Sequence, residues 1–414
     1  MTAPVPYYDA LETRDPAVRE AQLLAALPGL VAHAKRRAPA FRARFKGVDP
    51  KSITTRKALA QLPVTRKSDL IALQKQSLPF GGFAAVKPGQ MSHIFASPGP
   101  IYDPESGTRD YWRVARALYA AGVRKGDILH NAFGYHLTPA GWMLDSGARA
   151  IGCAVIPGGV GNTEQQIAAI RDIQPSSYCG TPSFLKILFE KARELGADLS
   201  SLKNGLVAAE PLPPSLRAEL KSHGVAVLQW YGTADLGLVS YETPALEGMV
   251  LDEALLLEIV KPGTGEPVED GEIGEIVVTS FNRTYPLIRF ATGDLSAVLP
   301  GASPCGRTNV RIRGWLGRAD QTTKVRAMFV YPAQIAEVVR RHPEIGRARL
   351  VVTSENNLDV ATLQCETKAV DGDLARRIGE TFQAVCKVRS EVSLVAPDRL
   401  PADGKVIDDQ RKFT

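Results

Sequence analysis

The strongest constraint on this fold is a regular alternation of amphipathic helices and short apolar strands between residues 109 and 232. Two predicted helices, residues 109–122 and 216–224, end at Gly122 and Gly224. Glycine is favoured just past a helix end because it readily adopts left-handed backbone angles. This alternation is typical of a parallel sheet covered by helices, so we expect an α/β fold.

Other local patterns predict where helices begin and where the chain changes character. Helical periodicity runs from about residue 9 to residue 45. We interpret Ser68 as the N-cap of a following helix and Thr163 as the cap of a helix over 163–173, because their hydroxyls accept bonds from free N–H groups at helix starts. From about residue 250 the chain has the turn signals of hairpin-rich β structure.

A small βαββαβ-like pattern follows residues 314–320. We therefore place a domain boundary at Asp320, with residues 1–319 as a large N-terminal domain and residues 320–414 as a small C-terminal domain. A chain of 414 residues is too long for one ordinary core and suits this division. The predicted helices cover 331–343 and 373–388, and the predicted strands cover 348–354, 359–367 and 391–396.

Composition argues against several classes of function. The formal net charge of +6 is spread along the chain without aromatic-interleaved basic patches, so we expect no nucleic-acid partner. The five cysteines show no C-x2-C spacing, which argues against a zinc site and suits a reducing cytosol. Neither a signal pattern nor an apolar run of membrane-spanning length is present, so we expect a cytoplasmic protein without a membrane partner.

Short motifs spread along the whole chain resemble, in order and spacing, those of one family. They are YYDALETRDPAVRE, LPVTRKSDL, AAGVRKGDILHNAFGYHLTPAG, VIPGGVGNTEQQI, GTPSF, AAEPLPPSLR, WYGTADLG, YPLIRFATGDL, CGRT, GRADQTTKVRAMFVYPAQI and LPADGKV. Each motif alone is weak, but their combination is specific. On these motifs the chain is identified as a member of the phenylacetate–coenzyme A ligase family, within the adenylate-forming acyl-CoA synthetase superfamily.

The resemblance implies an adenylate-forming enzyme fold, with a large α/β N-terminal domain and a small, mobile α+β C-terminal domain that carries a catalytic lysine. It implies that a carboxylate attacks the α-phosphate of ATP, with Mg²⁺ as cofactor, and that coenzyme A then displaces AMP from the acyl-adenylate. The expected partners are an aryl or arylacetic carboxylic acid, ATP and coenzyme A. A homodimer is suggested by analogy alone.

Asp294, in Thr292-Gly293-Asp294, is a candidate ribose-binding residue. A carboxylate at a strand end can accept hydrogen bonds from both ribose hydroxyls, although Gly-Asp is also ordinary turn chemistry. The resemblance assigns Asp294 to the ribose and Arg318 to the ribose or a phosphate.

The segment 230–237 follows a buried-looking strand. The resemblance implies that Tyr231 and Gly232 lie against adenine and that Thr233 donates its hydroxyl to the α-phosphate. Asp235 stands where the family usually has a glutamate that holds magnesium, and its shorter side chain suggests binding through a water. The alternative is a strand-end turn with Asp235 solvated.

Residues 208–217 resemble the segment that edges the adenine base, with Ala209, Glu210 and Pro211 as candidates. The alternative is that Glu210 and Pro211 only break the chain before a helix at Pro214.

Lys405, in LPADGKV, is the strongest catalytic candidate. Joining a carboxylate to an α-phosphate brings two anions together, and a preorganised cation stabilises the charge that develops. Lysine delivers a compact charge on a flexible stem. By resemblance, Lys405 arrives when the small domain rotates, with Asp320 as the hinge. The alternative is a solvated lysine after a glycine turn.

The resemblance places Arg326 at the coenzyme A tunnel. The family usually has glycine after this arginine, and the methyl group of Ala327 would narrow the tunnel. Phe133, Tyr135 and His136 are expected in the acyl pocket, where aromatic rings stack on an aromatic acid. Core packing is the alternative for Phe133.

Residues 93–108 depart most from the family, which has here a Ser/Thr/Gly-rich loop with a lysine that wraps the β- and γ-phosphates. We expect a rigid surface turn or a partial phosphate cradle. The departure also leaves an alternative function open, a homologue that binds nucleotide or acyl-CoA without adenylation. The departure from the family's loop consists of prolines that remove N–H donors and acids that repel phosphate: Pro98, Pro100, Pro104, Asp103 and Glu105.

Overall fold

The computed structural model describes residues 6–97, 101–210, 212–325, 328–355, 358–368 and 372–411, and the chain divides into two compact units. The first unit comprises the chain up to Gly314, except for residues 262–264 and 293–296. Those two short segments belong to the second unit, together with the residues from Trp315 onward. The boundary that we propose from the sequence, at Asp320, lies within this last stretch.

The first unit contains a nine-stranded sheet in the order β14-β15-β10-β9-β8-β7-β6-β4-β5. Strands β4 to β8 run parallel, which confirms the sheet predicted from the alternation. The remaining strands continue the sheet in antiparallel fashion from β8. Their bounds are β4 Ile128–Asn131, β5 Ala154–Pro157, β6 Ser177–Gly180, β7 Asn204–Val207, β8 Ala226–Thr233, β9 Gly237–Glu242, β10 Met249–Leu251, β14 Val298–Leu299 and β15 Arg311–Ile312.

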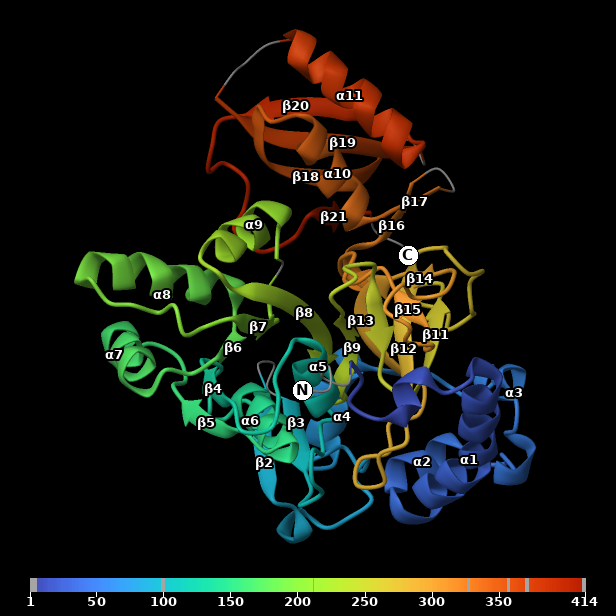
Figure 1. The fold of residues 1–414 in the computed structure, drawn as a ribbon. Coiled ribbons are helices and arrows are strands. Elements are labelled where there is room, and N and C mark those ends of the chain that lie inside the picture. Colours follow the sequence, from blue (N-terminus) through green and yellow to red (C-terminus); the bar gives the residue numbers. More distant parts are fainter. Residues whose placement is uncertain are drawn as a thin grey trace. The chain divides into compact units, whose positions relative to one another are not determined.

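Two helical layers cover this sheet, because successive side chains of a strand point to opposite faces. Tyr178 and Val207 pack in a core cluster with α7, α8 and α9, whereas Cys179 and Leu206 pack in the cluster of α5 and α6. Figure 1 shows α7 and α8 side by side. The bounds are α5 Ala115–Ala120, α6 Ala140–Ile151, α7 Thr163–Ile173, α8 Pro182–Leu195 and α9 Pro214–Ser222.

A second sheet has four strands in the order β1-β13-β12-β11. β11 and β12 form an antiparallel pair, which confirms the hairpin-rich β structure predicted after residue 250. The largest core cluster joins these strands to the N-terminal helices. The bounds are β1 Thr65–Arg66, β11 Leu255–Val260, β12 Gly274–Ser280, β13 Phe290–Ser296, α1 Pro16–Arg37, α2 Pro39–Arg44, α3 Arg56–Ala60 and α4 Leu70–Gln76.

Both predicted N-caps are wrong. Ser68 lies inside a 3-10 turn, and α4 begins only at Leu70. Thr163 is the first residue of α7 and follows Asn162, whose positive φ of 49° makes the abrupt entry. A side-chain cap does form at α8, where the Thr181 Oγ1 accepts a hydrogen bond from the Phe184 N–H at 3.3 Å.

The helix predicted over 109–122 is shorter than expected, because α5 begins at Ala115. Asp110 and Arg113 have positive φ angles of 49° and 64°, which a right-handed helix does not allow. The Asp110 carboxylate accepts a hydrogen bond from the Ala115 N–H at 3.2 Å. Local side-chain bonding of this kind competes with helix formation, and hydrophobic periodicity does not report it.

We expect Asp110→Asn to flatten the pH dependence of stability between pH 4 and pH 7. Burial raises the pKa of Asp110 from 3.8 to about 7, with Arg113 opposing and Asp252 adding to the shift. The folded protein therefore loses stability as pH rises through this range, by at most about 4 kcal/mol at about 1.4 kcal/mol per pKa unit. Asparagine keeps the acceptor oxygen without the charge, so the free energy of unfolding of the variant increases relative to that of the wild type as pH rises.

Denaturant unfolding of both proteins at pH 5 and pH 8 measures this difference. Parallel changes in the free energy of unfolding would show that Asp110 does not titrate in this range. Asp172→Asn, at an exposed position, is the matched control.

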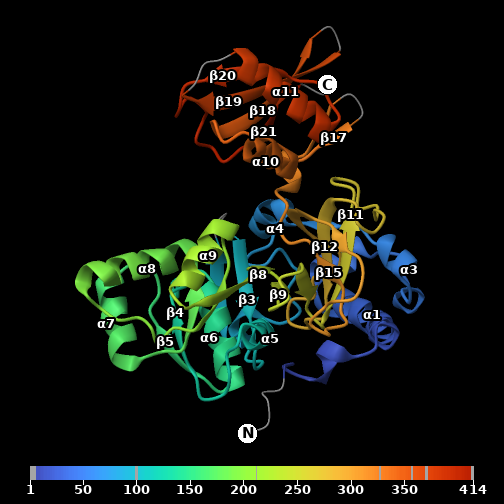
Figure 2. The ribbon, with the colours of Figure 1, turned by 45° about the horizontal axis from the view of Figure 1, so that its top comes forward.

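The second unit has a four-stranded sheet in the order β20-β19-β18-β21 and a separate hairpin of β16 and β17. Helices α10 and α11 pack together against this sheet (Figure 2). Both predicted helices and all three predicted strands are confirmed, and β21 adds a strand parallel to β18. The bounds are β16 Thr323–Val325, β17 Met328–Val330, α10 Pro332–Arg341, β18 Ile345–Glu355, β19 Leu358–Thr367, α11 Gly372–Cys386, β20 Glu391–Val395 and β21 Ile407–Asp409.

Across the described ranges, no helix combines the length and the apolar character needed to cross a membrane.

Candidate functional site

Three of the predicted nucleotide-binding residues, Tyr231, Gly232 and Thr233, end β8 directly before the turn to β9. Thr233 pairs with Gly237, and its Oγ1 accepts a hydrogen bond from the Leu236 N–H at 3.1 Å, which leaves the hydroxyl hydrogen available to an external acceptor. Gly232 has no room for a side chain, because a Cβ there would lie 2.3 Å from the Gly237 carbonyl oxygen. The close approach of the Gly237 backbone explains why residue 232 is a glycine.

Tyr231 is tied to the second sheet. Its hydroxyl donates a hydrogen bond to the Thr292 Oγ1 at 3.1 Å, and the Thr292 hydroxyl bonds to the Ile276 carbonyl at 3.3 Å. These bonds fix the end of β8 against β12 and β13. The ring is half-buried, and its assignment to adenine stays a prediction.

Asp235 lies in the same turn, but its carboxylate faces the interior. The side chain is completely buried, and its Oδ2 forms an ion pair with the Lys67 Nζ at 2.6 Å. The alternative of a solvated Asp235 is therefore wrong. A magnesium ligand must reach an ion that keeps several waters, and a buried carboxylate already neutralised by a lysine does not fit that role. Within the described ranges, no three His, Cys, Asp or Glu side chains gather as a metal-binding group.

The predicted adenine-edging segment adopts a strained conformation. Ala209 has a φ of 72°, in the left-handed region that disfavours residues with a Cβ. The Glu210 Oε1 accepts a hydrogen bond from the Ser183 N–H at 2.6 Å, at the beginning of α8. A carboxylate there complements the helix dipole, so Glu210 has a structural partner of its own. Pro211 lies outside the described residues.

Asp294 and Arg318 come together within the second unit. The Arg318 Nη1 lies 3.2 Å from the Asp294 Oδ1, and the two residues form an isolated β-bridge. The indole N–H of Trp315 donates to the same Oδ1 at 3.0 Å. Gly293 permits this approach, because its φ is 78° and a Cβ would lie 2.8 Å from the Arg318 Nη2. The structure thus joins two residues that sequence reasoning paired by role alone.

Lys405 lies on an exposed turn of the second unit. Its Nζ lies 3.3 Å from the Asp408 Oδ1, and the side chain is 54% exposed. The Asp403 Oδ1 accepts a hydrogen bond from the Lys405 N–H at 3.1 Å, and Gln321 bonds to the Gly404 carbonyl at 3.2 Å. Among the described residues, Asp408 is the ion-pair partner of Lys405, and an exposed lysine can leave such a pair at small cost.

The predicted hinge residue, Asp320, lies in a 3-10 turn over Ala319–Gln321. Arg326, predicted at the coenzyme A tunnel, and Ala327 fall outside the described residues. Their roles stay predictions.

The predicted acyl-pocket residues differ in their surroundings. Phe133 is buried in the core cluster that contains Trp112 and Trp230, as its alternative interpretation proposed. The Tyr135 hydroxyl accepts a hydrogen bond from the Asn131 Nδ2 at 2.7 Å. His136 is exposed.

Residues 93–97 and 101–105 form a β-hairpin, β2 (His93–Ser97) and β3 (Ile101–Glu105), and not the irregular surface turn that we expected. The partial phosphate cradle stays a prediction. Asp103 is fully buried, so it does not face a phosphate as the sequence suggested. The Glu105 Oε2 instead lies 2.7 Å from the His93 Nδ1. Residues 98–100 lie outside the described residues.

Sequence reasoning missed Lys67 and Trp315. Lys67 belongs to the motif LPVTRKSDL, but a lysine in a loop gives no local sign of a buried partner. Trp315, in GWLGRAD, is 51% exposed. A tryptophan three residues before Arg318 is a sequence signal for this site that the motif comparison did not use.

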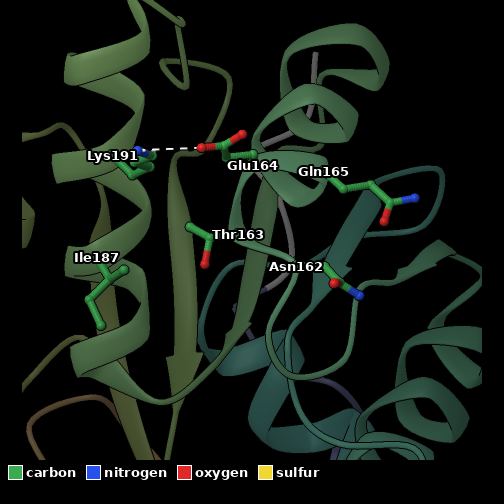
Figure 3. Close-up of a pocket in the computed structure, with 6 residues that line it drawn as sticks. All are labelled: Asn162, Thr163, Glu164, Gln165, Ile187 and Lys191. Carbon is green, nitrogen blue, oxygen red and sulfur yellow. Dashed lines mark ion pairs between the residues drawn. The ribbon is translucent and has the colours of Figure 1, made fainter.

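One surface hollow lies apart from these residues. It has a volume of about 440 Å³ and is open to solvent between α7 and α8 (Figure 3). An ion pair of 3.4 Å between the Lys191 Nζ and the Glu164 Oε1 crosses it. None of the predicted site residues lines this hollow, so it carries no part of the candidate site.

Comparison with known proteins decides the family. Residues 140–282 match the model of the AMP-binding enzymes, and residues 327–411 match that of the AMP-binding enzyme C-terminal domain. The phenylacetate–coenzyme A ligase of Thermus thermophilus is 34% identical over 372 residues, which are 86% of this chain and 82% of the relative. The chain belongs to the phenylacetate–coenzyme A ligase family. It is therefore an AMP-forming acid–coenzyme A ligase by family.

Another relative agrees with this family, and a solved structure shares the fold. The phenylacetate–coenzyme A ligase of Escherichia coli is 32% identical over 379 residues, which are 87% of this chain and 85% of that ligase. An open conformation of 2-hydroxyisobutyryl-CoA ligase, in complex with its acyl-AMP and CoA, has a TM-score of 0.87 at 24% identity. The superposition covers 99% of this chain and 95% of that ligase chain. This likeness confirms the adenylate-forming fold predicted from the motifs.

Proposed function

We propose that this family member activates an aryl or arylacetic acid with ATP and transfers the acyl group to coenzyme A. The observation that carries the proposal is identity of about one third to phenylacetate–coenzyme A ligases along most of the chain. Asp294, Arg318 and Lys405 are all present where the family's motifs require them. Acyl-AMP and CoA in the complex of the 2-hydroxyisobutyryl-CoA ligase support the same substrates here.

In the first step a carboxylate oxygen attacks the α-phosphorus of ATP, and pyrophosphate leaves with the electrons of the broken P–O bond. Lys405 stabilises the negative charge that accumulates on the α-phosphate oxygens. Asp294 accepts the ribose hydroxyls, Arg318 contacts the ribose or a phosphate, and the hydroxyl of Thr233 donates to the α-phosphate.

In the second step the coenzyme A sulfur forms a bond to the acyl carbon, its proton is lost to solvent, and AMP leaves. We assign Arg326 to this step and the hinge at Asp320 to the rotation between steps. A need for Mg²⁺ and a homodimer also belong to this proposal, although Asp235 as it stands does not fit the metal.

An aromatic substrate is supported by aromatic side chains near the loop after β4. The rings of His93 and Trp142 lie 4.5 Å apart, and those of Tyr135 and Trp142 lie 5.5 Å apart. The Trp142 indole N–H donates to the Tyr135 carbonyl at 2.9 Å, which fixes the loop. Such rings offer flat apolar faces to an aryl group.

The proposal is tested by acid-dependent exchange of labelled pyrophosphate into ATP. A panel of benzoic, phenylacetic, cinnamic and short-chain acids is compared at equal concentration, and we expect exchange at least tenfold above background with an aryl or arylacetic acid. Formation of the thioester is then followed with coenzyme A. Exchange with no acid, together with retained AMP or acyl-CoA binding, would instead support a homologue that does not adenylate.

A further inference from the structure

We propose that Lys67 is a positioning residue for adenylation: with Asp235, and with the buried Asp103 beside that pair, it forms a buried ionic cluster that holds the turn between β8 and β9. Asp235 is then a structural anion and not a metal ligand. This inference rests on the proposed function, because Thr233 is the last residue of β8, directly before that turn.

The pairing of Lys67 with Asp235 is the first part of the cluster. The Nζ–Oδ2 distance is 2.6 Å, the Asp235 side chain is fully buried, and the Lys67 side chain is 25% exposed. A buried carboxylate is stable only with a partner of opposite charge, because it has lost its hydration. The two residues are 168 positions apart, so the pair joins the segment after β1 to the β8–β9 turn.

Asp103 is the second part. Its Oδ2 accepts a hydrogen bond from the Ser97 hydroxyl at 2.8 Å, and its side chain is fully buried on β3. The Oδ1 atoms of Asp103 and Asp235 are buried and accept no hydrogen bond from the described residues. Burial, followed by the charge of Asp235, raises the pKa of Asp103.

The cluster is braced by uncharged neighbours. The Gln74 side chain bonds to both the carbonyl and the N–H of Tyr102, at 2.9 Å and 2.8 Å, and so ties α4 to β3. Tyr285 is fully buried beside both carboxyls.

The position of the cluster gives it an effect on the nucleotide. Asp235 lies two residues after Thr233 and one before Leu236, whose N–H bonds to the Thr233 hydroxyl. Loss of the Lys67 charge would leave Asp235 buried and unpaired, and the turn would have to open to hydrate it. Thr233 would then lose its orientation, so we expect loss of the Lys67 charge to weaken nucleotide binding.

A double-mutant cycle on the full chain tests this inference. Lys67→Met should weaken AMP binding, measured by calorimetry, by about tenfold and should lower the thermal midpoint. Asp235→Asn added to Lys67→Met should recover most of both losses, because no buried charge is left unpaired. Lys67→Arg should retain AMP binding within about threefold. Lys57→Met, at an exposed lysine, is the matched control.

Several outcomes would overturn the inference. If Lys67→Met has the AMP affinity and the thermal midpoint of the wild type, the Lys67–Asp235 pair does not hold the β8–β9 turn. Asp235 would be a metal ligand if two results came together. The double variant would bind AMP no more tightly than Lys67→Met, and Asp235→Asn would need tenfold more Mg²⁺ for half-maximal pyrophosphate exchange. If Lys67→Met does not fold, the same comparison is made with Lys67→Gln.

The readouts also separate this inference from the proposed function. AMP affinity and thermal midpoint report on the cluster even if no acid supports exchange. Absence of exchange in the wild type, with the cycle behaving as expected, would count against the ligase proposal and not against the cluster.

Discussion

Lys405→Ala should lower acid-dependent pyrophosphate exchange by about 10²- to 10³-fold or more, while AMP binding stays within about threefold. The side chain of Lys405 is exposed and, among the described residues, pairs with Asp408, so its ammonium group is available to move to the α-phosphate. Removing one preorganised charge or donor from a developing anion typically costs a factor of this size. Ground-state binding of AMP lacks the charge that Lys405 stabilises and should change little.

The measurement is the exchange rate at saturating acid and ATP, with AMP affinity determined separately. Lys368→Ala removes another exposed lysine of the second unit and should leave exchange unchanged. If Lys405→Ala exchanges pyrophosphate at the wild-type rate, Lys405 is the solvated turn lysine of the alternative interpretation.

Asp294→Ala should raise the KM for ATP and lower kcat/KM for ATP by about 10²-fold or more. Two hydrogen bonds from ribose hydroxyls to a carboxylate are each worth about 1.5 kcal/mol or more, and about 1.4 kcal/mol is a factor of ten. The variant also removes the Asp294 Oδ1, the acceptor that the Trp315 indole and the Arg318 guanidinium share in the structure.

A comparison of ATP with 2′-deoxy-ATP and 3′-deoxy-ATP makes this test specific to the ribose. The wild type should discriminate against both analogues, and Asp294→Ala should discriminate much less. Asp172→Ala, which removes an exposed Asp–Arg pair in the first unit, is the matched control. Equal discrimination in wild type and Asp294→Ala would show that Asp294 only forms a turn and does not bind the ribose.

The altered segment over 93–108 now has a structural explanation. Its acids do not stand in a phosphate site, because Asp103 is buried with Asp235 and Glu105 pairs with His93. The hairpin therefore uses these carboxyls for internal contacts. The charge argument against binding a triphosphate loses its strongest part, whereas the missing lysine and the prolines remain departures from the family.

Much of the fold was predictable from local pattern. The spacing of apolar residues indicates whether a segment is a helix or a strand, and glycines mark where helices end. The ends were less predictable: Asp110 and Arg113 shorten α5, and Asn162 begins α7 with left-handed backbone angles. Those angles depend on side-chain bonds and packing that periodicity does not contain.

The sequence by itself determined the parallel sheet, the small C-terminal pattern and the family, because each depends on residues close together in the chain or on the order of short motifs. Tertiary structure alone decided the state of Asp235. Whether a carboxylate meets solvent, a metal or a lysine depends on which distant segments fold against it, and Lys67 lies 168 residues away. The charge of a buried group is a property of its surroundings, and those surroundings exist only in the folded chain.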